Sequence, residues 1–211
     1  MTRYRVGLLV LGAALLTGTA VTVGRNSVPS AKKADPATAA ASSNRPVPGN
    51  LVDFRDDRAG WAIAYPRTWN RLQSSDATVV LVASEKPPEA GDGGSILGRV
   101  VPLPAAIDDS TLPAAREITD RIVNGEGVQL LAQPTVVHEG GLPGYFYFYS
   151  FRDPATGQEG VHSHYFLFKR STMISLVFQA LPQANFKALA NLYDDVIGSF
   201  RVLKESANAA G

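Results

Sequence analysis

Residues 60–66 read GWAIAYP, and this stretch, followed by Trp69, is the most informative part of the sequence. Large apolar residues alternate here with alanines, which is the period of a β-strand with one apolar face. Pro66 has no backbone N–H and is expected to end the strand. The stretch therefore predicts a buried strand near the start of a folded domain. The residues on its large face are Trp61, Ile63 and Tyr65.

Further β segments lie on both sides of this strand. Residues 51–56 form a short first candidate, and the continuous apolar run at 77–84 predicts a buried strand. Glycines and prolines at 86–94 predict a loop. Residues 95–101 then predict another strand, which we expect to end at Pro102.

The apolar period changes to that of a helix after residue 108. Residues 108–111 (DDST) offer helix-capping side chains, and residues 124–125 (NG) predict the end of this helix. A second helix is predicted to open at Pro182 and to end at Gly198. The first apolar stripe contains Ala114, Ala115, Ile118, Ile122 and Val123, and the second contains Phe186, Leu189, Ala190, Tyr193, Val196 and Ile197.

Four β segments separate the two helices. Residues 128–139 predict a strand broken near Pro134, and three long strands follow at 145–152, 161–170 and 173–180. Short turns join the long strands, which predicts an antiparallel meander. The order of strands, helix, strands and helix predicts an α+β fold with a central, mostly antiparallel sheet and helices packed on its faces.

Two short motifs carry a family resemblance. The GWAIAYP strand with its following tryptophan, and the ending VIGSFR at 196–201, resemble the opening strand and the close of the PsbP-like domains, or Mog/PsbP/LpqN fold. The resemblance implies a central antiparallel sheet between helices, an α/β/α sandwich, in an exported protein of actinobacterial type. It also implies an adaptor-like role, because the group includes a binder of a small GTPase, accessory subunits of photosystem II and mycobacterial envelope proteins. No ligand of that group can be matched to residues of this chain.

The N-terminal residues 1–25 are interpreted as a membrane anchor or an export signal. Arg3 and Arg5 precede an apolar run at residues 6–23, and Arg25 closes it. A helix of this length spans about 27 Å, close to the thickness of a hydrocarbon core. The length favours an uncleaved, single-pass anchor, and a cleaved signal peptide is the alternative. The basic residues ahead of the run keep the N-terminus inside, so the C-terminal domain is expected outside the cytoplasm.

A linker separates this segment from the domain. Residues 26–49 consist mainly of Ala, Ser, Pro, Lys and Asn, a composition that cannot bury enough apolar surface to order itself. The sequence thus predicts a disordered tether at 26–49, one PsbP-like domain at 50–204 and a flexible tail at 205–211.

Charge and cysteine content exclude several classes of function. The chain has 20 Lys and Arg, 19 Asp and Glu and no cysteine. Six of the basic residues and one acid lie in residues 1–49, so the remainder is mildly acidic and offers no basic stripe for nucleic acid. Without cysteine there is neither a disulfide framework nor a thiolate metal site.

His162 and His164 form the one pattern that resembles a metal site. Residues two apart on a strand share a face, but zinc requires a third and usually a fourth ligand. If the preceding hairpin centres on residues 155–156, Tyr149 lies opposite His162 and Tyr147 opposite His164. Because tyrosines are poor zinc ligands, the sequence predicts no metal site here.

The same alternation of side chains along the strands places polar aromatic residues on one face of the sheet. Tyr145, Tyr147, Tyr149, His162 and His164 combine apolar area with polar tips, which suits contact with a partner protein. The alternative is that a helix covers this face and its polar groups pair internally. The face also carries Phe166, Ser175 and Gln179.

These observations predict function only by class. We expect a membrane-tethered, extracytoplasmic, non-catalytic binding or accessory module of the cell envelope with a protein partner. The alternative is a carrier or sensor for a small apolar ligand. No nucleophile with a base and no ligand set is present in the sequence, so neither an enzyme nor a cofactor is expected.

Overall fold

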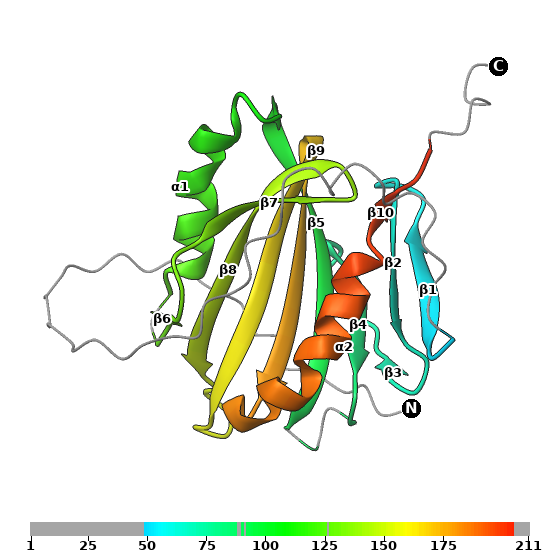
Figure 1. Ribbon diagram of the computed structural model, residues 1–211, viewed down its shortest axis with the longest axis vertical. Coiled ribbons are helices and arrows are strands. Elements are labelled where there is room, and N and C mark those ends of the chain that lie inside the picture. Colours follow the sequence, from blue (N-terminus) through cyan, green and yellow to red (C-terminus); the bar gives the residue numbers. More distant parts are fainter. Residues whose placement is uncertain (1–48, 88–89, 91, 126, 205–211) are drawn as a thin grey trace, which may run out of the picture.

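Two antiparallel sheets and two helices form the part of the chain that the computed structural model describes, which is residues 49–87, 90, 92–125 and 127–204 (Figure 1). The predicted anchor, almost all of the predicted linker and the predicted tail lie outside these residues. Within them, neither helix has the length and apolar content needed to cross a membrane.

The smaller sheet is built on the GWAIAYP stretch. Strand β2 (Trp61–Pro66) lies between β1 (Leu51–Asp56) and β10 (Arg201–Val202), and both neighbours run antiparallel to it. The first four residues of β2 are fully buried, so the alanines face packed surroundings as the large residues do. The first and last strands of the domain thus lie on opposite edges of β2.

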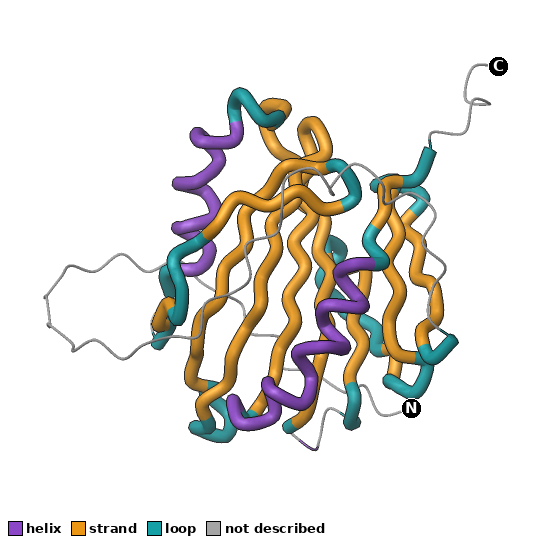
Figure 2. The backbone as a smooth tube through the Cα atoms, viewed as in Figure 1, coloured by secondary structure: helices purple, strands orange, loops and turns teal. Residues whose placement is uncertain are grey.

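The larger sheet has seven strands in the order β3-β4-β5-β9-β8-β6, with β7 also paired to β8. Its longest element, β9, pairs with β8 through its first half and with β5 through its second. The chain reverses near Arg170, where φ is 53°, and Figure 2 shows the two halves of β9 side by side. The strands are β3 (Asn70–Arg71), β4 (Val79–Ser84), β5 (Gly93–Ile107), β6 (Gln129–Leu130), β7 (Thr135–Glu139), β8 (Leu142–Arg152) and β9 (Glu159–Leu181).

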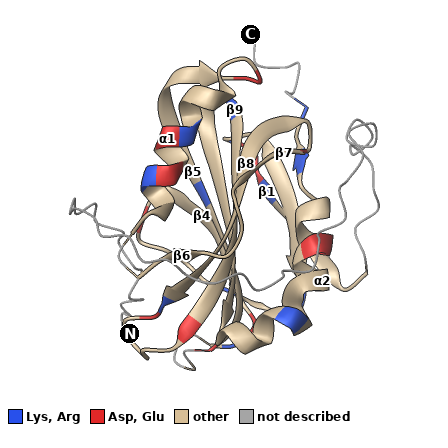
Figure 3. Cartoon of the chain, turned by 60° about the vertical axis from the view of Figure 1, so that its left-hand side comes forward, with Lys and Arg blue, Asp and Glu red and all other residues tan. Residues whose placement is uncertain are grey.

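The helices pack on opposite faces of the larger sheet (Figure 3). Helix α2 (Phe186–Gly198), preceded by a 3-10 turn at Gln183–Asn185, packs with Ile174 and Phe178 and also contacts the smaller sheet. Helix α1 (Leu112–Val123) packs on the other face, over β8. The predicted α+β class with helices on both faces is therefore confirmed.

The larger sheet is the predicted central antiparallel sheet, and the remaining strands form a second, smaller sheet beside it. Strand β2 already has β1 on one edge and β10 on the other, so neither edge remains for β4. The two sheets share one core instead, in which Trp61 and Ile63 pack with Leu81 and Leu176.

The prediction that a strand ends at Pro102 is wrong. Strand β5 continues through Pro102 and Pro104 to Ile107. Pairing with β4 stops at Arg99, and the N–H of Val100 still donates to the carbonyl of Thr78 at 2.8 Å. From Val101 onward the pairing of β5 in the described residues is with β9, so fewer of its backbone N–H groups are needed. The register with β9 shifts between Pro102 and Ile107.

The predicted stripe of α1 is correct only in part. Ala115 and Val123 are buried as expected, but Ile118 is 39% exposed and Ala114 is also exposed. Thr119 is fully buried in place of Ile118, because it contacts a tyrosine hydroxyl of the sheet. The predicted stripe of α2 agrees better, with Leu189, Tyr193, Val196 and Ile197 all buried.

Candidate functional site

The two motifs that suggested the family meet in space. The Ser199 hydroxyl accepts a hydrogen bond from the backbone N–H of Ala64 at 2.8 Å. The ring of Phe200 stacks on Trp61 with 5.8 Å between centroids. Ser199 and Phe200, which follow α2, therefore contact the middle and the start of β2. These contacts place β10 beside Gly60.

The predicted register of the polar aromatic face is confirmed. Tyr147 pairs with His164 and Tyr149 with His162 across β8 and β9. These residues and Tyr145 lie on the face of the larger sheet that α1 covers in part.

Helix α1 contacts this face through hydrogen bonds to two tyrosines. The Tyr145 hydroxyl donates to the carbonyl of Leu112 at 3.1 Å. The Tyr147 hydroxyl donates to the Asp120 carboxylate at 2.6 Å and lies 2.6 Å from Thr119 Oγ1. Burial raises the pKa of Tyr147 to about 12, and its bond to Asp120 acts in the same direction. Burial also raises the pKa of Asp120, but the bonds from Tyr147 and Arg116 outweigh it and hold that pKa below its usual value.

Beyond α1 the face carries a continuous chain of hydrogen bonds centred on Tyr149. Its hydroxyl lies 3.1 Å from Nδ1 of His162 and 3.1 Å from Nδ1 of His164. The far ring nitrogens contact Gln179 Oε1 at 2.9 Å and Ser175 Oγ at 2.7 Å. Phe151 stacks on His162 with 4.1 Å between ring centroids, so it covers the outer end of this series of hydrogen bonds.

Only one placement of the hydrogen atoms gives every donor and acceptor in this series of hydrogen bonds a partner while both histidines stay neutral. Gln179 Oε1 only accepts, so His162 carries its hydrogen on Nε2 and its Nδ1 accepts from Tyr149. The Tyr149 oxygen can then accept from Nδ1 of His164, whose Nε2 accepts from Ser175. The two histidines are therefore opposite tautomers.

Burial keeps both imidazoles neutral. It lowers the pKa of His162 to about 4, although the bond to Gln179 acts in the opposite direction. Burial, together with nearby His162 and Arg99, holds the pKa of His164 well below its ordinary value near 6.5. Burial also raises the pKa of Tyr149 above its usual range.

The five residues proposed for partner contact thus all bond to other groups of the protein in this structure. Tyr145, Tyr147, Tyr149 and His164 are each 5% exposed or less, and His162 is half-buried. Their placement agrees with the alternative interpretation of the sequence, in which a helix covers this face and its polar groups pair internally. A partner would have to displace α1 to reach Tyr145 and Tyr147, to which this helix is hydrogen-bonded. Within the described residues, no group of three or more His, Asp and Glu side chains is placed to hold a metal ion.

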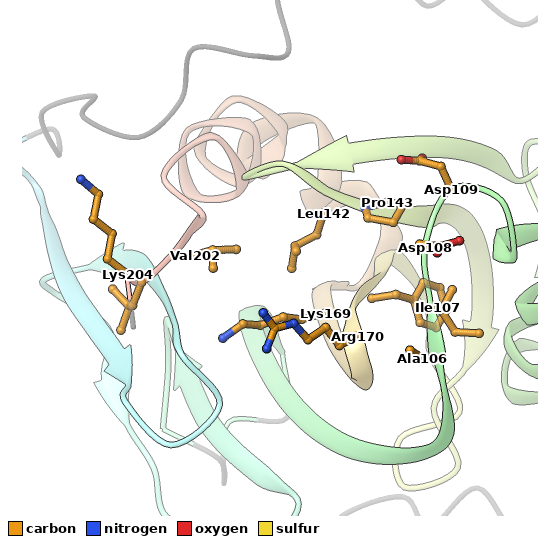
Figure 4. A pocket seen from close by; sticks show the side chains of 12 residues that line it. Ala106, Ile107, Asp108, Asp109, Leu142, Pro143, Lys169, Arg170, Val202 and Lys204 are labelled. Carbon is orange, nitrogen blue, oxygen red and sulfur yellow. The ribbon is translucent and has the colours of Figure 1, made fainter. Parts of the chain in front are cut away.

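An open cavity of about 640 Å³ lies elsewhere, where the reversal of β9 approaches the smaller sheet (Figure 4). Four separate segments form its walls: the end of β5, the start of β8, the turn within β9 and β10 with the residues after it. The apolar lining residues are Ala106, Ile107, Leu142, Pro143, Phe168, Val202 and Leu203, and the charged ones are Asp108, Asp109, Lys169, Arg170 and Lys204.

A second, polar hollow of about 410 Å³ adjoins the first and shares Lys169, Leu203 and Lys204 with it. The turn between β1 and β2 contributes its remaining walls, which are Arg55, Asp57, Arg58 and Gly60. The Lys169 ammonium crosses between the sheets and donates to the carbonyls of Ala59 and Gly60, at 2.9 and 3.1 Å. Sequence reasoning missed this site, because no motif marks it.

The comparisons with known proteins agree on the fold. No family model and no curated protein sequence matches the chain. The structure is similar to that of the cyanobacterial PsbP from Synechocystis sp. PCC 6803, with a TM-score of 0.51 and 15% identity over 72% of this chain and 92% of that chain. A protein of Bacteroides thetaiotaomicron VPI-5482 gives a TM-score of 0.52 and 13% identity over 72% of this chain and 48% of that chain.

A third structure, LpqN of Mycobacterium tuberculosis, described as involved in cell envelope biogenesis, gives a TM-score of 0.49. It is 12% identical over 68% of this chain and 83% of that chain. At such identities, likeness shows a fold and not an activity. The resemblance seen in the two sequence motifs is therefore confirmed at the level of architecture: the chain has an α+β fold of the Mog1/PsbP type.

Proposed function

We propose that this protein is a non-catalytic binding module held at the outer side of the cell membrane. The apolar run at 6–23 with arginines on both sides supports a single membrane pass. The Ala, Ser and Pro-rich stretch at 26–49 supports a tether long enough to separate the domain from the bilayer.

The observation that carries the binding role is the open cavity between the sheets. Its volume of about 640 Å³ falls in the range of small-molecule sites, which is about 300–1,000 Å³. A stable protein partner usually covers about 800 Å² of surface, and the tyrosines of the polar aromatic face are buried. The geometry therefore favours a small ligand from the envelope over a protein partner.

The location is tested by fractionating cells that express the full chain. We expect the protein in the membrane fraction, with the domain digested by protease added to the outside of spheroplasts. A soluble mature protein that begins near Val21 would reject the anchor and leave only export.

The binding role is tested with a photo-cross-linking amino acid at Leu142, which lines the cavity, and at the exposed Ala188 of α2 as the control position. An adduct of small mass at Leu142 alone supports a ligand site. A protein-sized adduct at Leu142 would restore the protein partner. Equal labelling at both positions would reject the cavity as the recognition site.

A further inference from the structure

We propose that the two adjoining hollows bind an amphiphile with an anionic head, either a carboxylate or a phosphate. The head would lie on Arg58, Lys169 and Lys204, and the aliphatic tail would lie on the apolar floor of the larger hollow. This inference rests on the proposed function of the cavity and names the class of ligand.

The larger hollow supplies the surface for the tail. Pro143 and Phe168 are buried beneath it, and Ile107, Leu142 and Val202 are half-buried around it. Figure 4 shows Val202 and Ile107 on opposite sides, with Leu142 between them. Apolar side chains from three strands thus leave partly exposed area, and covering that area with a hydrocarbon chain is favourable.

The smaller hollow supplies positive charge. Of the acids that line the two hollows, Asp57 pairs with Arg55 at 3.2 Å and Asp109 pairs with His138 at 2.6 Å. Asp108 accepts hydrogen bonds from Ser110 and Thr111. The acids of the site are therefore already engaged by neighbouring side chains and backbone groups.

Three of the cations that line the hollows have no carboxylate partner among the described residues. Arg58 and Lys204 are exposed and make no ion pair there. Lys169 is half-buried, and within the described part of the chain its ammonium bonds only to two backbone carbonyls. Charge complementarity thus favours an anion at the junction of the hollows, while residues 50–211 as a whole are mildly acidic.

Lys169 is held in position for this role. An ammonium has three hydrogens, and the carbonyls of Ala59 and Gly60 accept two, so one remains for a ligand. Gly60 has φ +70° and no side chain, and a methyl group there would overlap the Lys169 nitrogen. In Figure 4 the nitrogen ends of Lys169 and Arg170 point toward the side of Lys204 and away from Asp108 and Asp109.

The experiment uses the full chain in nanodiscs of phosphatidylcholine. Four photoreactive probes share a twelve-carbon tail with a terminal diazirine and differ in their heads, which are carboxylate, phosphate, hydroxyl and trimethylammonium. Peptide mapping then locates the tail. We expect the anionic probes to label peptides that contain Ile107, Leu142 or Val202 about tenfold more strongly than the hydroxyl probe.

Comparison of the carboxylate and phosphate probes distinguishes a fatty acid from an acidic phospholipid. Competition by inorganic phosphate or acetate measures how much the head group alone contributes to binding. We expect labelling to fall with rising salt, because the cations are partly exposed to solvent.

Two variants separate binding from folding. Lys169→Met removes the central cation but also its bonds to the smaller sheet, so its melting temperature is measured in parallel. Arg58→Gln combined with Lys204→Gln removes charges that make no ion pair within the described residues, and we expect about tenfold weaker labelling with an unchanged melting temperature. Lys187→Gln, an exposed cation at the start of α2, is the matched control and should change neither.

The outcomes distinguish the proposal of an anionic amphiphile from the proposed binding function of the cavity. Equal labelling by the hydroxyl and carboxylate probes would overturn the anionic head and leave a ligand cavity in place. Preference for the trimethylammonium probe would overturn it as well. No labelling of the cavity peptides by any probe would reject an amphiphile, while a small adduct at Leu142 in cells would still support the binding role.

Discussion

Tyr149 connects two histidines that carry opposite tautomers. At pH 7 we expect His162 protonated on Nε2 only and His164 on Nδ1 only, because Gln179 accepts at one end and Ser175 donates at the other. Nitrogen-15 correlation spectra of the imidazoles distinguish these tautomers directly. Two identical tautomers, or a charged ring at pH 7, would contradict the assigned chain.

Two partly buried groups act on stability with opposite signs between pH 7 and pH 5. Burial lowers the pKa of His162 to about 4, so the unfolded chain binds its proton first and stability falls with falling pH. Burial raises the pKa of Glu139 to about 7, against the effect of His138, so the folded chain binds that proton first and stability rises. Each change amounts to about 2 kcal/mol over this window.

We therefore expect variants at the two positions to shift the pH dependence in opposite directions. The Glu139→Gln variant should lose about 2 kcal/mol more of its unfolding free energy from pH 7 to pH 5 than the parent, and His162→Gln about 2 kcal/mol less. Urea unfolding at the two pH values measures both, and each variant is the control for the other. Shifts of equal sign would show that these groups do not have the pKa values assigned.

The sequence predicted the pairing of these residues but not their bonding. A hairpin centred on residues 155–156 fixes which tyrosine lies opposite which histidine, and alternation places Ser175 and Gln179 on the same face. The bonds depend on side-chain rotamers and on the reversal within β9, and neither follows from alternation. For the same reason a burial-driven change in pKa was beyond sequence reasoning.

At the scale of elements, α1 is attached to the sheet through a polar contact within an apolar surface. The Tyr147→Phe substitution removes a hydroxyl that Asp120 and Thr119 both contact, which leaves buried polar groups short of a partner. We expect a loss of about 1–3 kcal/mol in unfolding free energy. Chemical denaturation measures it.

The matched controls are Tyr65→Phe and the pair Tyr147→Phe with Thr119→Val. Tyr65 is a half-buried tyrosine whose hydroxyl makes no hydrogen bond within the described residues, so its change should stay within about 0.5 kcal/mol. The pair removes both hydroxyls and should cost less than the sum of the two single changes. Additive costs would show that the two hydroxyls do not interact.

Helix α1 also shows where periodicity misleads. Hydrophobicity alone selected Ile118 for the buried stripe, whereas Thr119 takes that place because a hydroxyl on the sheet faces it. The continuation of β5 through two prolines has a similar origin. Whether a proline ends a strand depends on which edge of the strand is paired, and that is a property of the sheet.

At the scale of the whole molecule, Gly60 is the point where the two sheets are joined. Its carbonyl accepts from the backbone N–H of Leu203 at 3.0 Å and from the Lys169 ammonium. The GWAIAYP stretch predicts the fold, but no residue pattern predicts the cavity beside it. Its walls come from segments up to about a hundred residues apart, and only the relative placement of the two sheets brings them together.

The same arrangement defines where the folding unit begins. Leu51 is buried, the carbonyl of Asn50 accepts from the N–H of Arg67 at 2.9 Å, and Phe54 packs edge-on against Trp61 at 5.4 Å. The residues that complete the smaller sheet therefore start at Asn50, and nothing in the composition of residues 26–49 is suited to a core.

We expect a truncated chain of residues 46–211 to unfold in one cooperative transition, with the stability of the domain in the full chain. A chain that begins at Asp57 is the contrasting variant, because it lacks β1 and exposes the side of Trp61 that Phe54 covers. The loss of buried Leu51 and Phe54 should cost about 3–6 kcal/mol, enough to remove most of the stability of a domain of this size. Calorimetry and near-ultraviolet circular dichroism compare the two chains. A cooperative transition in the shorter chain, or its absence in the longer one, would place the start of the folding unit elsewhere.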